Sequence, residues 1–233
     1  MPDDAQTPWP RAVIFDLDGT LIDSAPDIAR AVNRALIDYR IDIDAATARR
    51  FLGDGARKLV ERVLAAHGIA LDETTVERLT ERFSACYRDE PCRDSVVFEG
   101  AAAALCALQA RGVRLAVCTN KPRAIAERVI AALDLEPYLD VVIGAGQYAL
   151  KPDPAPLFAA LNALVCGAEE AVYVGDMAVD RQAGHAAGLP VLLAEFGYAA
   201  EPAAGLGADG VLEDWHKITD AIAALRVIGC FRD

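Results

Sequence analysis

The chain has 233 residues, of which 54% are hydrophobic, and its formal net charge at pH 7 is -12. This apolar fraction excludes intrinsic disorder, and the length allows one large domain or two modest ones. The acidic balance argues against a nucleic-acid partner or an anionic membrane partner, because both need a face rich in lysine and arginine. The polar N-terminus, MPDDAQTP, does not resemble a secretory leader, and six scattered cysteines without a CxxC pair favour reduced thiols, so we expect a cytoplasmic protein.

The first part of the chain predicts one strand followed by helices. A buried strand is expected at 11–15, and a polar turn follows it at 18–20. The helices that apolar residues at helical spacing predict next lie at 27–39, 56–67 and 72–88. Gly68 ends the second of these helices. No strand is expected between 24 and 94, so this segment is interpreted as all-helical.

From Gly100 onward, helices alternate with short strands rich in valine and leucine. The predicted helices lie at 101–111, 123–133, 155–164, 180–187 and 215–225, and the predicted strands at 114–118, 141–143, 172–174 and 191–193. This alternation predicts an α/β fold, with a Rossmann-like parallel sheet and helices on both faces. The simplest organisation is a core of residues 1–22 and 95–233, with an all-helical domain of residues 23–94 inserted after the first strand. Ligands of such sheets bind beyond the carboxyl ends of the strands, where we expect the chemistry.

Polar side chains follow the first two strands of the predicted sheet. Asp16 and Asp18 are two residues apart, so in extended chain their carboxylates point the same way. At about 4 Å they repel by ~4 kcal/mol at an effective dielectric near 20, which calls for a cation or a shared proton. A solvated Asp-Gly turn is the alternative. Thr119, Asn120 and Lys121 follow the next strand and offer a hydroxyl, an amide and a cation for a phosphate contact, unless Thr119 or Asn120 only caps a helix.

The other two strand ends add a lysine and two carboxylates. Residues 144–149 loosely match the dinucleotide fingerprint GxGxxG/A, but the prolines on either side of Asp153 prevent the helix that this motif needs, so we reject a nucleotide fold. Lys151 is then a fixed cation at the sheet edge or an exposed surface lysine. Asp176 and Asp180 are four residues apart at a helix start and can face one point, unless Asp176 only caps the helix.

The coincidence of these groups at one edge of one sheet predicts a phosphate site that contains a metal. Carboxylates without a nearby histidine suit a hard, oxygen-loving cation, Mg²⁺ above all. A Mg²⁺ site beside a lysine and a hydroxyl is typical of phosphate binding. One aspartate is then free to act as a nucleophile.

The four groups, in this order, resemble the motifs of the haloacid dehalogenase-like superfamily of phosphohydrolases. The matching positions are DLDGT at 16–20, Thr119, Lys151 before a proline, and Gly-Asp at 175–176 with Asp180. The resemblance covers nearly the whole chain, and the helical insertion resembles the type-one cap of that superfamily.

The resemblance implies a role for each residue. Asp16 attacks phosphorus, and Asp18 protonates the leaving alcohol and then activates the water that hydrolyses the aspartyl phosphate. Thr119 hydrogen-bonds the phosphoryl oxygens with Asn120 beside it, and Lys151 offsets negative charge. The implied Mg²⁺ ligands are Asp16, the backbone carbonyl of Asp18, and Asp176, with Asp180 nearby.

Within the superfamily, four segments look like those of bacterial phosphoglycolate phosphatases: 23–29, 51–55, 119–122 and 196–198. This likeness implies hydrolysis of 2-phosphoglycolate to glycolate and phosphate. The cap loop formed by Gly53, Asp54 and Gly55 is expected to face the site. Arg57 or Lys58 is expected to meet a substrate carboxylate, unless both are solvated helix residues, and Arg57 is the favoured candidate. The partner would be a small phosphomonoester, bound by a monomer or a homodimer.

Other functions remain open at this point. The same motifs and cap serve β-phosphoglucomutase and phosphatases of other sugar phosphates, such as N-acetylmuramate 6-phosphate. A receiver domain of a signalling protein also accepts a phosphoryl group, but it lacks the second aspartate and the helical insertion. A binding protein that has lost activity is disfavoured, because every catalytic position is filled.

Overall fold

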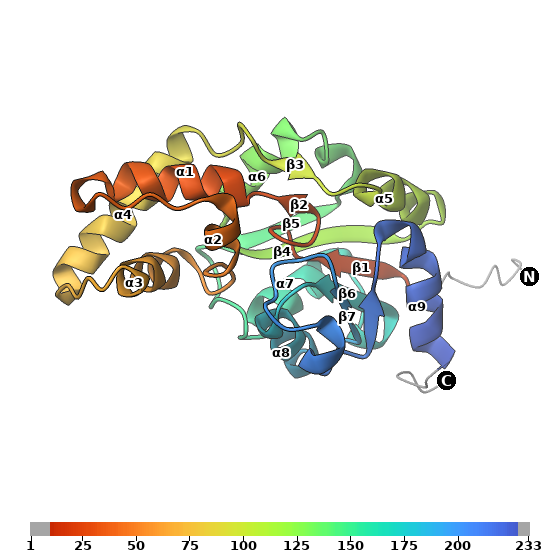
Figure 1. Cartoon of the computed structure of the whole chain (residues 1–233). Helices are drawn as coiled ribbons and strands as arrows, with labels where there is room; N and C mark the ends of the chain where they lie inside the picture. Colours follow the sequence, from red (N-terminus) through yellow and green to blue (C-terminus); the bar gives the residue numbers. More distant parts are fainter. Residues whose placement is uncertain (1–9, 228–233) are drawn as a thin grey trace, which may run out of the picture.

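The computed structural model describes residues 10–227, which form a parallel sheet flanked by helices, with a further group of helices beside it (Figure 1). The parts of the predicted core at 1–9 and 228–233, with Cys230, lie outside the described residues. Over residues 10–227, no helix combines the length and the apolar character needed to cross a bilayer.

Six strands form the main sheet, in the order β5-β4-β1-β6-β7-β8, and each neighbouring pair is parallel. Their bounds are β1 Ala12–Phe15, β4 Arg114–Pro122, β5 Val141–Ala145, β6 Ala171–Gly175, β7 Val191–Ala194 and β8 Gly210–Leu212. The predicted α/β class and the five predicted strands are therefore confirmed. The prediction missed β8, because a three-residue strand is too short to show a hydrophobic period.

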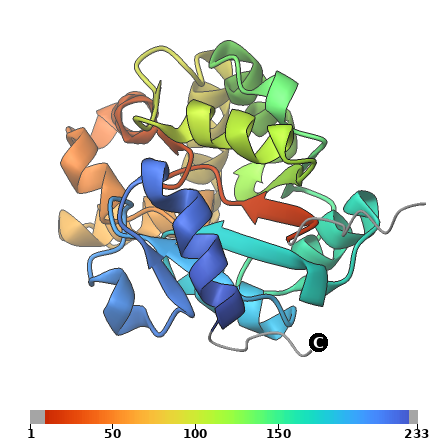
Figure 2. The same ribbon diagram turned by 90° about the vertical axis from the view of Figure 1, so that its right-hand side faces the viewer.

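The sheet is buried on both faces, because alternate residues of its strands enter two different cores. In β1, Val13 and Phe15 pack into one core, and Ala12 and Ile14 pack into the other. The helices on the first face are α5 (Ala101–Ala110), α6 (Arg123–Ala132) and α9 (Ile218–Val227), and those on the second are α7 (Ala155–Leu164) and α8 (Ala178–Ala186) (Figure 2). Burial on both sides explains why these strands are continuous apolar runs.

The segment between β2 (Ile22–Asp23) and β3 (Val96–Val97) forms helices that pack on one another beside the sheet (Figure 1). Their bounds are α1 Ala25–Ala35, α2 Ala45–Arg49, α3 Ala56–Ala66 and α4 Glu73–Asp89. β2 and β3 pair antiparallel, so the chain enters and leaves this helical segment through one two-stranded ribbon. The prediction missed the ribbon and α2, because elements of two and five residues carry no clear period.

Short 3-10 helices complete the described chain, at Ile37–Tyr39, Glu136–Tyr138, Ala168–Glu170, Ala203–Leu206 and Trp215–Lys217. The last of these corresponds to the start of the helix predicted at 215–225, and α9 corresponds to its remainder.

Asp27 in α1 joins the outgoing chain to the returning chain at the base of the helical segment. It is fully buried, accepts hydrogen bonds from the backbone N–H groups of Arg93 (3.0 Å) and Ser95 (2.8 Å), and pairs with Arg30 at 2.5 Å. Burial opposes ionisation of this carboxyl, but the hydrogen bonds outweigh burial and lower the pKa of Asp27. The two ends of the helical segment are therefore held together by one ionised side chain.

We expect Asp27→Asn to lower the free energy of unfolding at pH 7 by about 2 kcal/mol, because the amide group cannot accept all the hydrogen bonds of the carboxylate and does not pair with Arg30. Since the pKa of Asp27 is lowered by folding, this contribution is lost as the pH falls below about 4, and the two proteins should converge in stability there. Urea denaturation at pH 7 and pH 3 measures both effects, with the exposed Asp220→Asn as the matched control. An unchanged urea midpoint for Asp27→Asn at pH 7 would contradict this account.

Candidate active site

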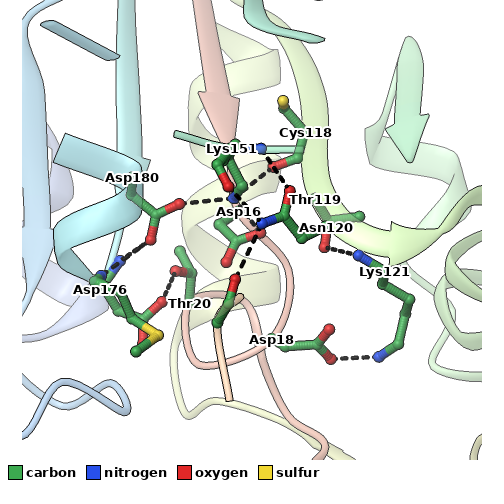
Figure 3. Close-up of polar contacts among 12 residues, drawn as sticks. Asp16, Asp18, Thr20, Cys118, Thr119, Asn120, Lys121, Lys151, Asp176 and Asp180 are labelled. Atoms are coloured by element: carbon green, nitrogen blue, oxygen red, sulfur yellow. Dashed lines mark hydrogen bonds and ion pairs between the residues drawn. The ribbon is translucent and has the colours of Figure 1, made fainter. Parts of the chain in front are cut away.

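The polar residues of the predicted site lie together at the carboxyl edge of the sheet (Figure 3). Asp16 follows β1, Thr119 lies near the end of β4, and Asp176 follows β6. These three strands are adjacent and parallel, so their carboxyl ends meet at one edge. Lys151 comes from the loop after β5, and Asp180 comes from the first turn of α8. Side chains far apart in the sequence are thus brought into one cluster.

Lys151 is the buried cation of this cluster. Only 3% of the residue is exposed, and its Nζ lies 2.8 Å from Asp16 Oδ1 and 2.6 Å from Asp180 Oδ1. It also donates to the carbonyl oxygen of Cys118 (3.1 Å) and to the hydroxyl oxygen of Tyr173 (2.8 Å). Burial opposes its charge, but the two carboxylates outweigh burial and raise the pKa of Lys151. Lys151 is therefore a fixed positive charge beside Asp16, not an exposed surface lysine.

Asp180 holds this lysine in place. Its Oδ1 accepts hydrogen bonds from Lys151 and from the hydroxyl of Tyr173 (2.8 Å). Its Oδ2 accepts from the backbone N–H groups of Asp176 (3.2 Å) and Met177 (3.0 Å). Asp180 is fully buried, and both of its oxygens are engaged by the protein. It therefore fixes Lys151 relative to the loop that follows β6.

Asp176 is fully buried and has only neutral hydrogen-bond donors around it within residues 10–227. Its Oδ1 accepts from the hydroxyl of Thr20 (3.0 Å), and its Oδ2 accepts from the N–H of Tyr198 (2.7 Å). Burial, followed by the carboxylates of Asp180 and Asp16, raises the pKa of Asp176 well above its ordinary value. This carboxylate therefore lacks the positive partner that Lys151 provides for Asp16.

Two glycines allow the chain to close around Asp176. A Cβ atom at Gly19, where φ is +88°, would lie 2.4 Å from Asp176 Oδ2. A Cβ atom at Gly197 would lie 2.2 Å from the Cβ of Asp176. Neither position has room for a side chain, so both glycines are required for the close approach of the backbone to this carboxylate.

The carboxylate cluster fits a divalent cation. Asp16, Asp176 and Asp180 each offer an oxygen atom, and these oxygens lie within 4.8 Å of one another. Lys151 balances only one of the three negative charges, and burial raises the pKa of Asp16 to about 6. A buried site with oxygen donors and excess negative charge suits a hard divalent cation, which would favour the ionised form of these carboxyls.

Asp18 lines the same cavity as Asp16, but its carboxylate points toward Lys121 of β4 (Figure 3). Its Oδ1 pairs with the Nζ of Lys121 and accepts a hydrogen bond from the hydroxyl of Ser24 at 2.5 Å. Its side chain is not a member of the carboxylate cluster. The two aspartates of the DLD sequence thus have different partners: a lysine and two acids around Asp16, and a lysine and a hydroxyl around Asp18.

Thr119 and Asn120 differ in what their side chains bind. Thr119 Oγ1 accepts from the N–H of Lys121 (3.1 Å), so its own O–H remains a donor. Asn120 donates to the carbonyl oxygens of Gly53 and Lys151 (3.0 Å each) and accepts from the N–H of Lys151 (2.8 Å). The amide of Asn120 therefore ties the loop before α3 to the loop that carries Lys151. Asn120 also lines the cavity, so the substrate contact that the sequence suggested stays a prediction.

A cavity of about 80 Å³ lies between the carboxylate cluster and the helical segment. Gly53 and Gly55 lie in its wall, but the structure does not bring Asp54 or Arg57 into the lining. Each of these two forms an ion pair within the helical segment instead. Helix geometry explains the absence of Arg57: its neighbour Ala56 lines the cavity, and successive residues of a helix point about 100° apart.

Two further polar residues lie in the cavity wall: Lys121, which the sequence offered as part of a phosphate contact with Thr119 and Asn120, and Tyr87, which the sequence reasoning missed. Both are buried, and the Nζ of Lys121 lies 5.2 Å from the centroid of the Tyr87 ring. Burial raises the pKa of Tyr87 to about 12, so its phenol stays protonated at neutral pH. The available signal for Tyr87 was its four-residue spacing from Phe83, which also lines the cavity.

Comparison with known proteins places this site in a family. The profile of the haloacid dehalogenase-like hydrolases matches residues 13–194. A phosphoglycolate phosphatase of Rhodospirillum rubrum is 43% identical over 217 residues, which cover 91% of this chain and 90% of the relative. A phosphoglycolate phosphatase of Cupriavidus necator, named as the plasmid form, is 42% identical over 93% of this chain and 94% of the relative.

A solved structure of a similar protein has the same fold. The crystal structure of a predicted phosphoglycolate phosphatase from Haemophilus somnus superimposes with a TM-score of 0.82 at 28% identity, and the match covers 90% of this chain and 96% of that one. The profile match begins in β1 and ends in β7, so it includes all of the strand ends that carry the cluster. The chain belongs to the haloacid dehalogenase-like hydrolase family.

Proposed function

We propose that this hydrolase converts 2-phosphoglycolate to glycolate and phosphate, with a divalent cation and through an aspartyl phosphate. The observation that carries the proposal is the placement of Asp16, buried, 2.8 Å from the Nζ of Lys151 and in the wall of the same cavity as Asp18. Relatives named phosphoglycolate phosphatase at 43% and 42% identity support the choice of substrate.

In the first step, we assign Asp16 as the nucleophile. One of its carboxylate oxygens forms a bond to phosphorus while the bond from phosphorus to the glycolate oxygen breaks, which leaves an aspartyl phosphate. Asp18, in its protonated form, gives its proton to the departing glycolate oxygen. The position of Asp18 in the cavity wall, outside the carboxylate cluster, supports this division of roles.

In the second step, Asp18 acts as the base. It takes a proton from a water molecule, whose oxygen bonds to phosphorus as the bond to Asp16 breaks, and phosphate leaves. Thr119 would donate its O–H to the phosphoryl oxygens in both steps, and Lys151 would offset their negative charge.

We propose Mg²⁺ as the cation, held by Asp16, Asp176 and the backbone carbonyl of Asp18. The oxygen-only donors and the uncompensated charge of the cluster support this choice. When bound, Mg²⁺ would polarise the phosphoryl group and neutralise charge that develops on it. Asp180 would support Lys151, with which it is paired at 2.6 Å.

We further propose that residues 23–94 act as a cap over a core of residues 1–22 and 95–233. The support is that both parts contribute to the cavity wall and are joined through the ribbon of β2 and β3. A cytoplasmic location is proposed as well, because the cysteines of the described residues are all free thiols.

Asp16→Asn should lower kcat with 2-phosphoglycolate by at least about 10³-fold, because the nucleophilic oxygen of the carboxylate is replaced by an amide. Release of phosphate, measured at saturating substrate, provides the rate. Asp220→Asn, an exposed change on α9, is the matched control and should keep the wild-type rate. A rate near that of the wild type for Asp16→Asn would refute the assignment of the nucleophile.

Chelation of divalent cations should abolish hydrolysis, and Mg²⁺ should raise the Tm of the metal-free protein more at pH 7.5 than at pH 5. The pKa of Asp16 is raised to about 6 and that of Asp176 is raised further, so without metal the folded protein loses stability as the pH rises through 6. Mg²⁺ would compensate for this loss only where the carboxyls are ionised. Scanning fluorimetry measures the shift.

The control for the metal prediction is Asp176→Asn, which should lose most of the Tm increase that Mg²⁺ causes at pH 7.5. The proposed cation site would be wrong if Mg²⁺ shifted the Tm equally at both pH values, or if the chelated protein kept its full activity.

Among small phosphomonoesters, 2-phosphoglycolate should have the highest kcat/KM. Initial rates with 2-phosphoglycolate, glucose 6-phosphate and N-acetylmuramate 6-phosphate test this order, and β-glucose 1-phosphate tests for mutase activity through formation of glucose 6-phosphate. A strong preference for a hexose phosphate would overturn the proposed substrate and leave the hydrolytic chemistry in place.

A further inference from the structure

One residue of the cavity wall, Tyr87, has a polar group that the two chemical steps do not use, its hydroxyl. Tyr87 comes from α4 and is 4% exposed, and its hydroxyl has no hydrogen-bond partner within residues 10–227. The other residues that the helical segment adds to the lining are apolar or glycine, among them Ile28, Leu52, Leu59 and Phe83. A buried donor without a partner, on a residue that lines a cavity, calls for an explanation, and a ligand oxygen would supply the missing partner.

Lys121 supplies the positive charge beside this hydroxyl. Its Nζ pairs with Asp18 and lies 5.2 Å from the centroid of the Tyr87 ring. An ammonium group has three N–H donors, and Asp18 is its one carboxylate partner in the described part of the chain. The other lysine of the cavity wall, Lys151, is already engaged by two carboxylates, a carbonyl and a hydroxyl. Lys121 is thus the cation of the cavity wall with donors left for a ligand.

Lys121 lies in the part of the cavity where the non-reacting end of a substrate would be. Thr119 and Lys121 lie two positions apart in the irregular last part of β4, and both line the cavity. Asp18, the proposed acid, is paired with Lys121 and so lies next to it. A short substrate whose phosphoryl group lies at Thr119 and whose ester oxygen lies at Asp18 would extend its remaining atoms toward Lys121 and Tyr87.

We propose that Lys121 of the core and Tyr87 of the helical segment together bind the carboxylate of the substrate. The phenol O–H and an N–H of Lys121 each donate to a carboxylate oxygen, which makes a charge-assisted pair of hydrogen bonds. A cavity of about 80 Å³, against roughly 300–1,000 Å³ for sites of drug-sized ligands, suits a tail this short. The inference rests on the proposed function, because it names the groups that recognise one end of that substrate.

This arrangement discriminates against substrates that leave the hydroxyl of Tyr87 without a hydrogen-bond partner. An ester without a carboxylate would keep the hydroxyl of Tyr87 buried with no partner, and a site built for a hydrogen bond discriminates strongly against a ligand that cannot make it. Because Tyr87 and Lys121 belong to different parts of the molecule, the carboxylate also links the helical segment to the core.

The test measures binding without turnover, by isothermal titration calorimetry of Mg²⁺-loaded Asp16→Asn protein. The titrants are 2-phosphoglycolate and ethyl phosphate, which has the same phosphate ester on two carbons and no carboxylate. Adding Tyr87→Phe should weaken the binding of 2-phosphoglycolate about tenfold and that of ethyl phosphate less than about twofold, as expected for loss of one hydrogen bond to a charged group. Adding Lys121→Gln should show the same selectivity with a larger loss.

Tyr39→Phe, a matched change elsewhere in the helical segment, is the control and should alter neither dissociation constant. Thermal unfolding of each variant verifies that it is folded, and Tyr87→Phe keeps the ring that packs in the core. Equal weakening of both titrants by Tyr87→Phe, or no weakening of either, would overturn the inference.

The same titrations separate the inference from the proposed function. If Asp16→Asn protein binds 2-phosphoglycolate more tightly than ethyl phosphate, and adding Tyr87→Phe keeps that preference, the proposed carboxylate site is wrong. The proposed substrate is then retained. If Asp16→Asn protein binds both esters equally, the carboxylate site and the substrate are both refuted. The rate at which the wild type releases phosphate from the phosphomonoesters named above then decides whether the proposed hydrolytic activity is retained.

Discussion

The positive charge of Lys151 is the interaction on which the rest of the site depends. Its ammonium group lies between Asp16 and Asp180 in a buried region, where unpaired carboxylates would be strongly disfavoured. Asp180 is in turn held by two backbone N–H groups and by Tyr173, so the lysine has one well-defined position. The charge balance is incomplete because no lysine or arginine of residues 10–227 pairs with Asp176, and this excess of negative charge suits a divalent metal.

Two hydrogen-bond connections link this charged cluster to the helical segment. Asn120 joins the backbone of Lys151 to the carbonyl oxygen of Gly53. Tyr198 donates its backbone N–H to Asp176, and its hydroxyl donates to Asp23 (2.8 Å) at the entrance to the helical segment. Both connections begin at residues that carry or support the buried charges. The position of the helices over the cavity is therefore coupled to the cluster through specific groups, and not only through apolar packing.

The charge of the whole chain and the charge of the proposed ligand have the same sign, yet the site can bind an anion. Coulomb interactions between exposed charges are screened beyond about 8 Å at physiological salt, so the acidic surface has little effect inside the cavity. The positively charged residues of the cavity wall are Lys151 and Lys121, and in our proposal Mg²⁺ and the hydroxyl of Tyr87 also contact the anion. A net charge of -12 argues against polyanionic partners that spread over a surface, but it does not predict the sign of a small, enclosed ligand.

The sequence alone determined the parallel sheet and the chemistry-bearing residues at its edge, because both follow from local patterns: short apolar runs alternate with helices, and polar residues come directly after the strands. It did not determine which side chains of the helical segment meet them. Arg57 was expected in the cavity and lies outside it, whereas Tyr87 lines it. A helix presents each side chain in a different direction, and only the packing of α3 and α4 against the core decides which direction faces the cavity. The tertiary structure also decided the separate partners of Asp16 and Asp18, because these partners come from strands and loops that are distant in sequence.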